Sequence, residues 1–242
     1  MKYITPDNLC DYAFLNEDTL QKPVKGVCIY FHGFTDGTRY NESPFLGAEL
    51  GAKGIAWVFS YHSVWAWMSE TSQQFCEQVI DAVYEKLGIE ESVPLVVTGG
   101  SMGGMTALNY LFHGKRKAIA CAANCPVLSV KGYFEQAREA RAAILSAHIE
   151  KQGDLMEILT SLSPVDFAEK LPEIPYFFVF GKKDPSPAIN EHIEELKEKL
   201  SKNAIDYKVE FREKMEHCNM KDFPDTIGRF IEFISDAVNK KR

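Results

Sequence analysis

A serine stands among glycines in the segment Gly99-Gly100-Ser101-Met102-Gly103, which fits the pattern G-x-S-x-G. In this pattern a sharp turn between a strand and a helix presents the serine hydroxyl, and small flanking residues let the strand and the helix approach. The apolar run 94–98 predicts the strand, and the apolar periodicity of 102–113 predicts the helix. We therefore expect Ser101 to be a nucleophile; the alternative is an ordinary serine in a glycine-rich turn.

A serine hydroxyl is a weak nucleophile, so it needs a general base and an acid that orients the base. In this arrangement the acid precedes the histidine along the chain, and each follows a strand. Asp184 follows the apolar run 176–180, which makes it the expected acid. His217 follows the alternating run 207–212, which makes it the expected base; the alternative is a structural loop histidine. The rival acids near these strands are Asp206, Asp222 and Asp225.

The oxyanion of an acyl-transfer reaction needs two preorganised N–H donors. We expect one from Met102, which follows the nucleophile. The second is expected from Phe34, in the loop His32-Gly33-Phe34-Thr35 after the first strong strand. His32 is expected to shape this loop and to take no part in the chemistry.

Four aromatic residues are candidates for a substrate pocket. Trp65 and Trp67 follow the second strand, and their apolar faces suit an acyl or aryl group. Tyr133 and Phe134 lie in a later helical stretch. The alternative is that these side chains pack in the hydrophobic core. For Trp65 and Trp67 the two alternatives are equal, and for Tyr133 and Phe134 core packing is favoured.

The elements that must position these residues alternate along the chain. Strands followed by helices predict an α/β fold, with a mostly parallel sheet and helices on both faces. The stretch of about 126–174 shows helical patterns without a strand, so we expect one domain over 1–242 with a small helical cap inserted there. The predicted strands are 24–31, 55–59, 94–98, 118–123, 176–180 and 207–212, and the predicted helices outside the cap are 44–52, 70–87, 102–113, 189–200 and 227–238.

Composition narrows the function classes. The chain has 242 residues, of which 45% are hydrophobic and 25% charged, and this balance excludes disorder or a coiled coil for the whole chain. A net charge of −7 argues against a nucleic-acid partner. No apolar stretch is long enough for a membrane span, and the start lacks a signal peptide, so we expect a cytoplasmic protein. The six cysteines form no CxxC motif, so we expect reduced, mostly buried thiols and no zinc site.

Taken together, four motifs resemble those of α/β-hydrolase-fold serine hydrolases, over about residues 24–238: HGF at 32–34, GGSMGG at 99–104, GKKD at 181–184 and EHC at 216–218. The HGFT segment and the short cap are similar to compact prolyl-oligopeptidase-like esterases, including feruloyl-esterase-like enzymes. The resemblance implies an eight-stranded sheet, no metal or other cofactor, and a triad of Ser101, Asp184 and His217. Gly100 departs from this pattern, since a histidine or aromatic residue often precedes the serine. Glu216 departs as well, since glycine usually precedes the histidine.

The expected function is that of a carboxylesterase that cleaves small to medium acyl or aryl esters through an acyl-enzyme. A peptidase would use the same triad, and Glu135 and Glu139 offer only a weak hint of an anchor for a substrate amine. A thioesterase and a non-catalytic binding protein are further alternatives. The expected partner is a small-molecule ester; the sequence leaves open the acyl group, the alcohol and the oligomeric state.

Overall fold

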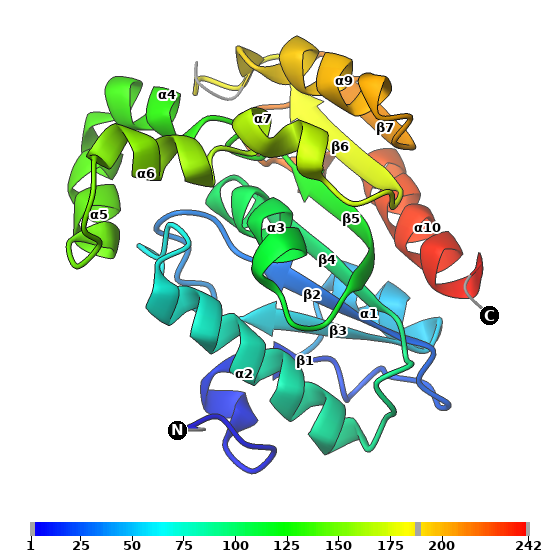
Figure 1. Cartoon of the computed structure of the whole chain (residues 1–242). Coiled ribbons are helices and arrows are strands. Elements are labelled where there is room, and N and C mark those ends of the chain that lie inside the picture. Colours follow the sequence, from blue (N-terminus) through cyan, green and yellow to red (C-terminus); the bar gives the residue numbers. More distant parts are fainter. Residues whose placement is uncertain (1–2, 187–189, 241–242) are drawn as a thin grey trace.

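A seven-stranded sheet forms the centre of the computed structural model, which describes residues 3–186 and 190–240 (Figure 1). The strand order is β1-β3-β2-β4-β5-β6-β7. All neighbouring strands are parallel except β1, which pairs antiparallel with β3. The predicted α/β fold is therefore confirmed. The strands are β1 Ala13–Leu15, β2 Gly26–Phe31, β3 Ile55–Ser60, β4 Leu95–Gly100, β5 Ala118–Asn124, β6 Tyr176–Gly181 and β7 Tyr207–Arg212.

Helices cover both faces of the sheet. Helices α1 (Phe45–Ala52) and α10 (Pro224–Lys240) lie on one face, and α2 (Glu70–Leu87) and α3 (Met102–His113) lie on the other (Figure 1). Helix α9 (Ile193–Lys202) connects β6 to β7. The chain between β5 and β6 forms α4 Val130–Gln136, α5 Arg138–His148, α6 Leu155–Leu162, α7 Pro164–Phe167 and the 3-10 turn η2 Ala168–Lys170.

Local sequence explains why α2 and α3 start and stop where predicted. The Ser69 side chain accepts the N–H of Ser72 and caps the start of α2. Gly88 ends that helix in a left-handed conformation with φ 61°, which glycine adopts without strain. Helix α3 begins at Met102, directly after Ser101, and its first N–H groups therefore point toward the end of β4.

Some expectations differ from the structure. The resemblance implied eight strands, whereas the described residues form seven, and the short antiparallel β1 was not predicted. The helical pattern over about 133–149 in the predicted cap is split at Ala137, whose φ of −100° and ψ of 94° are not helical. Helix α9 begins at Ile193; Ile189, included in that predicted helix, lies outside the described residues. None of the described helices is long and apolar enough to cross a membrane.

The buried apolar side chains form two clusters. The larger fills both faces of the sheet. We call the smaller one the cap core, because it joins the helices between β5 and β6 to the loop after β3 and the start of α3. The buried members of the cap core are Ala66, Trp67, Met68, Met102, Met105, Val127, Val130, Tyr133, Ala140, Ala143, Ile144, Leu159 and Leu162.

Candidate active site

Ser101 sits in the sharp turn that its glycines predict. Its φ of 55° and ψ of −121° lie outside the ordinary regions, and the residue is 6% exposed. A Cβ atom on Gly99 would lie 2.3 Å from the carbonyl oxygen of Gly103. A Cβ on Gly103 would lie 1.9 Å from the carbonyl oxygen of Phe31. Backbone contacts on both sides of the turn therefore leave no room for a side chain at either flanking position.

Among the described residues, six other than glycine have positive φ in loops that follow strands: Trp67 and Met68 after β3, and four at other strand ends. Thr35 follows β2, Ser101 follows β4, Cys125 follows β5 and Cys218 lies in the loop after β7, with φ values of 62°, 55°, 44° and 54°. Such conformations cost about 1–3 kcal/mol each, so the surrounding structure must hold them. These loops meet at the carboxyl edge of the sheet, where ligand sites of α/β proteins form.

The acid and the base lie together at this edge. His217 Nδ1 is 2.7 Å from Asp184 Oδ2, and the Asp184 side chain is fully buried while that of His217 is 30% exposed. The other Asp184 oxygen accepts the N–H of Ser186 at 2.9 Å. Two of the rival acids have other partners. Asp222 accepts from Asn219, and Asp225 pairs with Arg212 and Arg229.

The environment of His217 tunes its protonation. Burial lowers the pKa of the imidazole, but the hydrogen bond and the negative charge of Asp184 outweigh burial, so the pKa lies above its ordinary value of 6.5. The aspartate therefore favours the imidazolium that forms when a histidine takes a proton.

Gly181, the first residue of the GKKD motif, brings the two loops together. A Cβ on Gly181 would lie 2.2 Å from the carbonyl oxygen of Met215, which precedes the His217 loop. The same carbonyl accepts the N–H of Lys183 at 3.1 Å. The first residue of GKKD is thus glycine because the acid loop and the histidine loop touch through their backbones. A glycine at the end of an apolar strand was the signal available in the sequence.

Asn124, missed by the sequence analysis, joins the Ser101 turn to the His217 loop. Its backbone carbonyl accepts the N–H of Ser101 at 3.0 Å and the thiol of Cys218 at 3.2 Å. Its side-chain amide donates to the carbonyl of Cys218 at 3.1 Å. The hydrogen bonds of the described residues include none between Ser101 Oγ and His217; such bonds are often long before substrate binds.

The loop after β2 lies against Ser101. A Cβ on Gly33 would be 3.5 Å from Ser101 Cβ. Within the described chain, the backbone N–H groups of Phe34 and Met102 have no acceptor, so both are free to donate. His32 is fully buried, and its Nε2 lies 2.7 Å from the carbonyl oxygen of His62. This contact ties the loop to the chain after β3, which fits the shaping role expected for His32.

The structure accommodates the two residues, Gly100 and Glu216, that depart from the motifs of α/β-hydrolase-fold serine hydrolases. A Cβ on Gly100 would lie 2.8 Å from the Tyr30 hydroxyl and 3.3 Å from Cys218 Sγ. These two groups fill the space where a larger residue would stand before the serine. Glu216 is exposed, so the loop accommodates a side chain at a position where glycine is usual.

The structure separates the four aromatic pocket candidates. Trp67 is fully buried, and its ring centroid lies 5.4 Å from that of Tyr133, which is 9% exposed. Both belong to the cap core, and Phe134 packs against it partly buried. Trp65 is 51% exposed and meets the Phe34 ring edge-on at 6.1 Å. Of the four, Trp65 presents the largest free apolar face near the expected oxyanion loop.

Comparison with solved structures places this geometry in a known fold. Esterase B from Lactobacillus rhamnosis matches with a TM-score of 0.66 and 14% identity, over 91% of this chain and 78% of that one. An S-formylglutathione hydrolase from Agrobacterium tumefaciens matches with a TM-score of 0.70 and 13% identity, over 93% and 88%. The acylaminoacyl peptidase of Pyrococcus horikoshii matches with a TM-score of 0.72 and 13% identity, over 91% of this chain and only 38% of the peptidase.

Comparison at the level of sequence identifies no related protein. No family model matches the chain, and no curated protein matches it. The identities to the solved structures are low, so these matches define the architecture alone. The sheet, the covering helices and the structural matches together show that the chain has the α/β-hydrolase fold.

Proposed function

We propose that the chain is a serine hydrolase, and specifically a carboxylesterase for small to medium acyl or aryl esters. The observation that carries the proposal is the 2.7 Å contact between His217 and the buried carboxylate of Asp184. Asn124 ties the loop of His217 to the strained turn of Ser101. A base with its orienting acid beside a serine in such a turn is the arrangement that activates a hydroxyl.

In the first half of the reaction, Ser101 Oγ attacks the ester carbonyl and His217 takes the hydroxyl proton. The N–H groups of Phe34 and Met102 hold the oxyanion, helped by the positive end of the α3 dipole. The bond to the alcohol then breaks, His217 gives its proton to the alcohol oxygen, and the acyl group stays on Ser101. Asp184 holds the ring tautomer and stabilises the imidazolium.

In the second half, His217 takes a proton from water, and the resulting hydroxide attacks the acyl carbonyl. The tetrahedral intermediate is held by the same two N–H groups. It collapses to release the carboxylic acid, and the proton returns from His217 to Ser101 Oγ. Every proton removed is returned, so the reaction needs no group beyond the substrate and water.

We propose an ester rather than a peptide as the substrate, because the candidate anchors for a substrate amine are open to solvent. Glu135 and Glu139, the weak hint of an amine anchor, are both exposed, and Glu135 offers its backbone carbonyl to Arg141. The chain also spans only 38% of the acylaminoacyl peptidase that it matches, but 78% of the esterase. A peptidase and a thioesterase are therefore outcomes to be tested by substrate.

Labelling with a fluorophosphonate tests the nucleophile, because this reagent reacts with activated serines. The protein should be labelled, and Ser101→Ala should lose both labelling and nearly all ester hydrolysis. Ser235→Ala is the matched control: Ser235 is also buried, but it lies in α10 and donates to Ile231 within its own helix. Unchanged hydrolysis by a folded Ser101→Ala would refute the assignment.

A substrate panel tests the reaction type. Nitrophenyl and feruloyl esters, an acyl thioester and aminoacyl nitroanilides should be compared by kcat/KM on the same preparation. The proposal expects the oxygen esters to be cleaved fastest. Preference for the nitroanilides would instead identify a peptidase, and preference for the thioester a thioesterase.

A further inference from the structure

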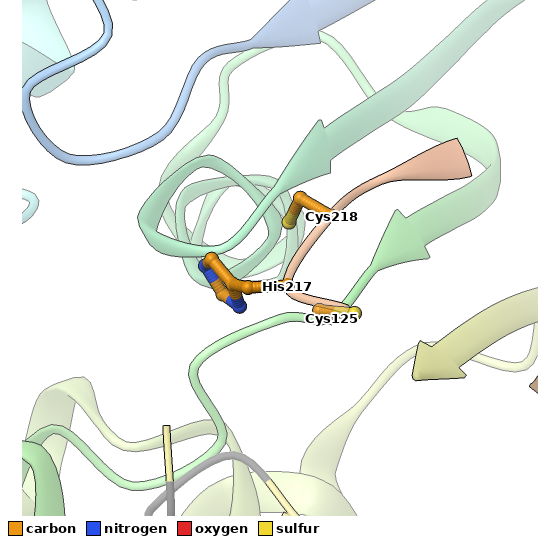
Figure 2. A group of neighbouring side chains, drawn as sticks. All are labelled: Cys125, His217 and Cys218. Carbon is orange, nitrogen blue, oxygen red and sulfur yellow. The ribbon is translucent and has the colours of Figure 1, made fainter. Parts of the chain in front are cut away.

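Two thiols lie beside the histidine of the candidate site (Figure 2). Cys125 follows β5, and Cys218 directly follows His217 in the loop after β7. The two sulfur atoms and a ring nitrogen of His217 lie within 4.8 Å of one another. The spacing of cysteines along the sequence predicts no such cluster, because the residues that form it come from two strand ends about ninety positions apart.

Two thiols and an imidazole are the donor set that Zn²⁺ and other thiophilic ions prefer. With Zn–S near 2.3 Å and Zn–N near 2.0 Å, tetrahedral donors lie about 3.5–3.8 Å apart. The donor atoms therefore have to approach one another by at most about 1 Å, which lies within the reach of side-chain rotation. Cys218 would give up its contact with the Asn124 carbonyl when it binds an ion.

The partner of His217 suits a metal ligand as well as a base. Histidines that bind metals commonly donate their other ring N–H to a carboxylate, which fixes the ring and raises its basicity. His217 Nδ1 lies 2.7 Å from Asp184 Oδ2, and no hydrogen bond of the described residues uses Nε2, so an ion bound through Nε2 would leave that bond in place. The buried charge of Asp184 would also offset part of the charge of the ion.

An ion can reach the cluster from solvent. Cys125 is fully buried, but Cys218 and His217 are both partly exposed. Cys218 and His217 line an open depression of about 500 Å³ together with Pro185, Glu216, Asn219 and Lys221. Water from this side can complete a fourth coordination position, as in zinc sites with three protein ligands.

We propose that Cys125, Cys218 and His217 form a binding site for a thiophilic cation such as Zn²⁺, and that the bound ion inhibits the hydrolase. Binding displaces the thiol protons to solvent and places the ion on the imidazole. The ring can then no longer take the proton of Ser101.

The inhibition rests on the proposed function, whereas binding itself does not. A disulfide would use only two of the three donors, so the cluster as a whole favours an ion.

Titration with Cd²⁺ tests the site independently of activity. The reduced, chelator-stripped protein should take up a single tight equivalent and show the ultraviolet absorption of a cadmium thiolate. Cys125→Ser and Cys218→Ser should each weaken uptake and reduce the absorption, with folding checked by circular dichroism. Cys10→Ser, which removes an exposed thiol in η1 (Leu9–Asp11), should behave like the unaltered protein. No thiolate absorption in the unaltered protein, or full absorption in both serine variants, overturns the proposal.

Zn²⁺ block of fluorophosphonate labelling tests the inhibition, with each variant compared with its own rate in chelator. At free Zn²⁺ about ten times Kd, labelling of the unaltered protein should fall about tenfold, because mass action leaves about one molecule in eleven unoccupied. The two serine variants should lose less than about twofold at the same concentration, since their affinity is lower. Equal block in all variants overturns the thiol site.

Two further outcomes separate the possible causes of failure. No labelling in chelator, with the Cd²⁺ absorption intact, would contradict the proposed function and leave the site supported. Rapid loss of two free thiols on mild oxidation, in a protein that binds no Cd²⁺ when reduced, would assign the pair to a disulfide and overturn the metal site.

Discussion

The strand-end loops and the cap core meet at Ser101, but they are held in different ways. The loops are fixed by backbone contacts: the Gly99 and Gly103 positions have no room for a Cβ, and Gly181 meets the Met215 carbonyl. The cap core is held by apolar side chains from several short helices and from the loop after β3. The groups expected to react belong to the first region, and most of the pocket candidates belong to the second.

This difference teaches where the chain tolerates change. A backbone overlap of an ångström or more cannot be relieved by rotating a side chain. An apolar cluster, by contrast, can be refilled with other side chains of similar total volume at modest cost. We infer that the strand ends define the reaction and that the cap core is free to define which substrate enters.

The largest effect is expected from Gly103→Ala. A Cβ there would lie 1.9 Å from the Phe31 carbonyl oxygen, so either β2 or α3 must move. Stability should fall by more than about 4 kcal/mol, as measured by urea unfolding. Gly228→Ala in α10 is the matched control, because its Cβ meets nothing within 4 Å. That change should stabilise the protein by about 0.5–1 kcal/mol. Similar stability in both variants would show that the turn is not held by backbone contact.

The next largest effect is expected from Asp184→Asn. The amide keeps the shape of the side chain but can donate to Nδ1, which fixes the wrong tautomer of His217. Turnover should fall by about 10⁴ if the pair acts as in known triads. The measurement is kcat for a nitrophenyl ester, with circular dichroism to show that the fold is kept. A fall of only a few-fold would assign the acid role to another residue.

A smaller effect, on stability more than on reaction, is expected from Trp67→Ala in the cap core. Removal of this fully buried side chain should cost about 3–5 kcal/mol in urea unfolding. Trp65→Ala, at a position 51% exposed in the same loop, should change stability by less than about 0.5 kcal/mol. Folded Trp67→Ala should still be labelled at Ser101 by fluorophosphonate. Full stability together with lost labelling would place Trp67 among the reacting groups.

The two regions also differ in how far the sequence predicted them. Apolar runs and apolar periodicity predicted the strands and helices nearly to their ends, because these signals are local, as the agreement of the predicted helix 70–87 with α2 shows. The turn of Ser101 and the loops of Asp184 and His217 followed from motif order on strand ends. The contacts of Asn124 and of Cys125 with the loop after β7 could not be predicted, since they depend on distances between strands.

The cap was harder to predict for a physical reason. Trp65 and Trp67 are two positions apart and chemically identical, yet one is exposed and the other is fully buried. Their environments depend on how α4, α5 and α6 pack on the loop after β3, and no motif or glycine encodes that packing. The sequence also did not predict the break at Ala137 between α4 and α5, because alanine itself favours a helix.

The smallest expected effect is a displacement of the pH profile, and it belongs to the strand-end loops alone. His217 must be neutral to accept a proton, so kcat/KM in the presence of chelator should rise about tenfold per pH unit below its pKa and then level off. Because Asp184 raises that pKa, the midpoint should lie above 6.5. Protonated His217 is favoured more in the folded protein than in the unfolded chain. The stability it contributes is therefore fully present below the unfolded pKa and is lost as pH rises through the folded pKa.

Activity should thus appear over the same pH range in which this contribution to the melting temperature disappears. Trp67→Ala should leave the midpoint of kcat/KM unchanged, because the Trp67 side chain makes no hydrogen bond to Asp184 or His217 among the described residues. A midpoint that moves with Trp67→Ala would show that the cap controls the electrostatics of the pair. The division between a region that sets the reaction and one that sets the substrate would then have to be given up.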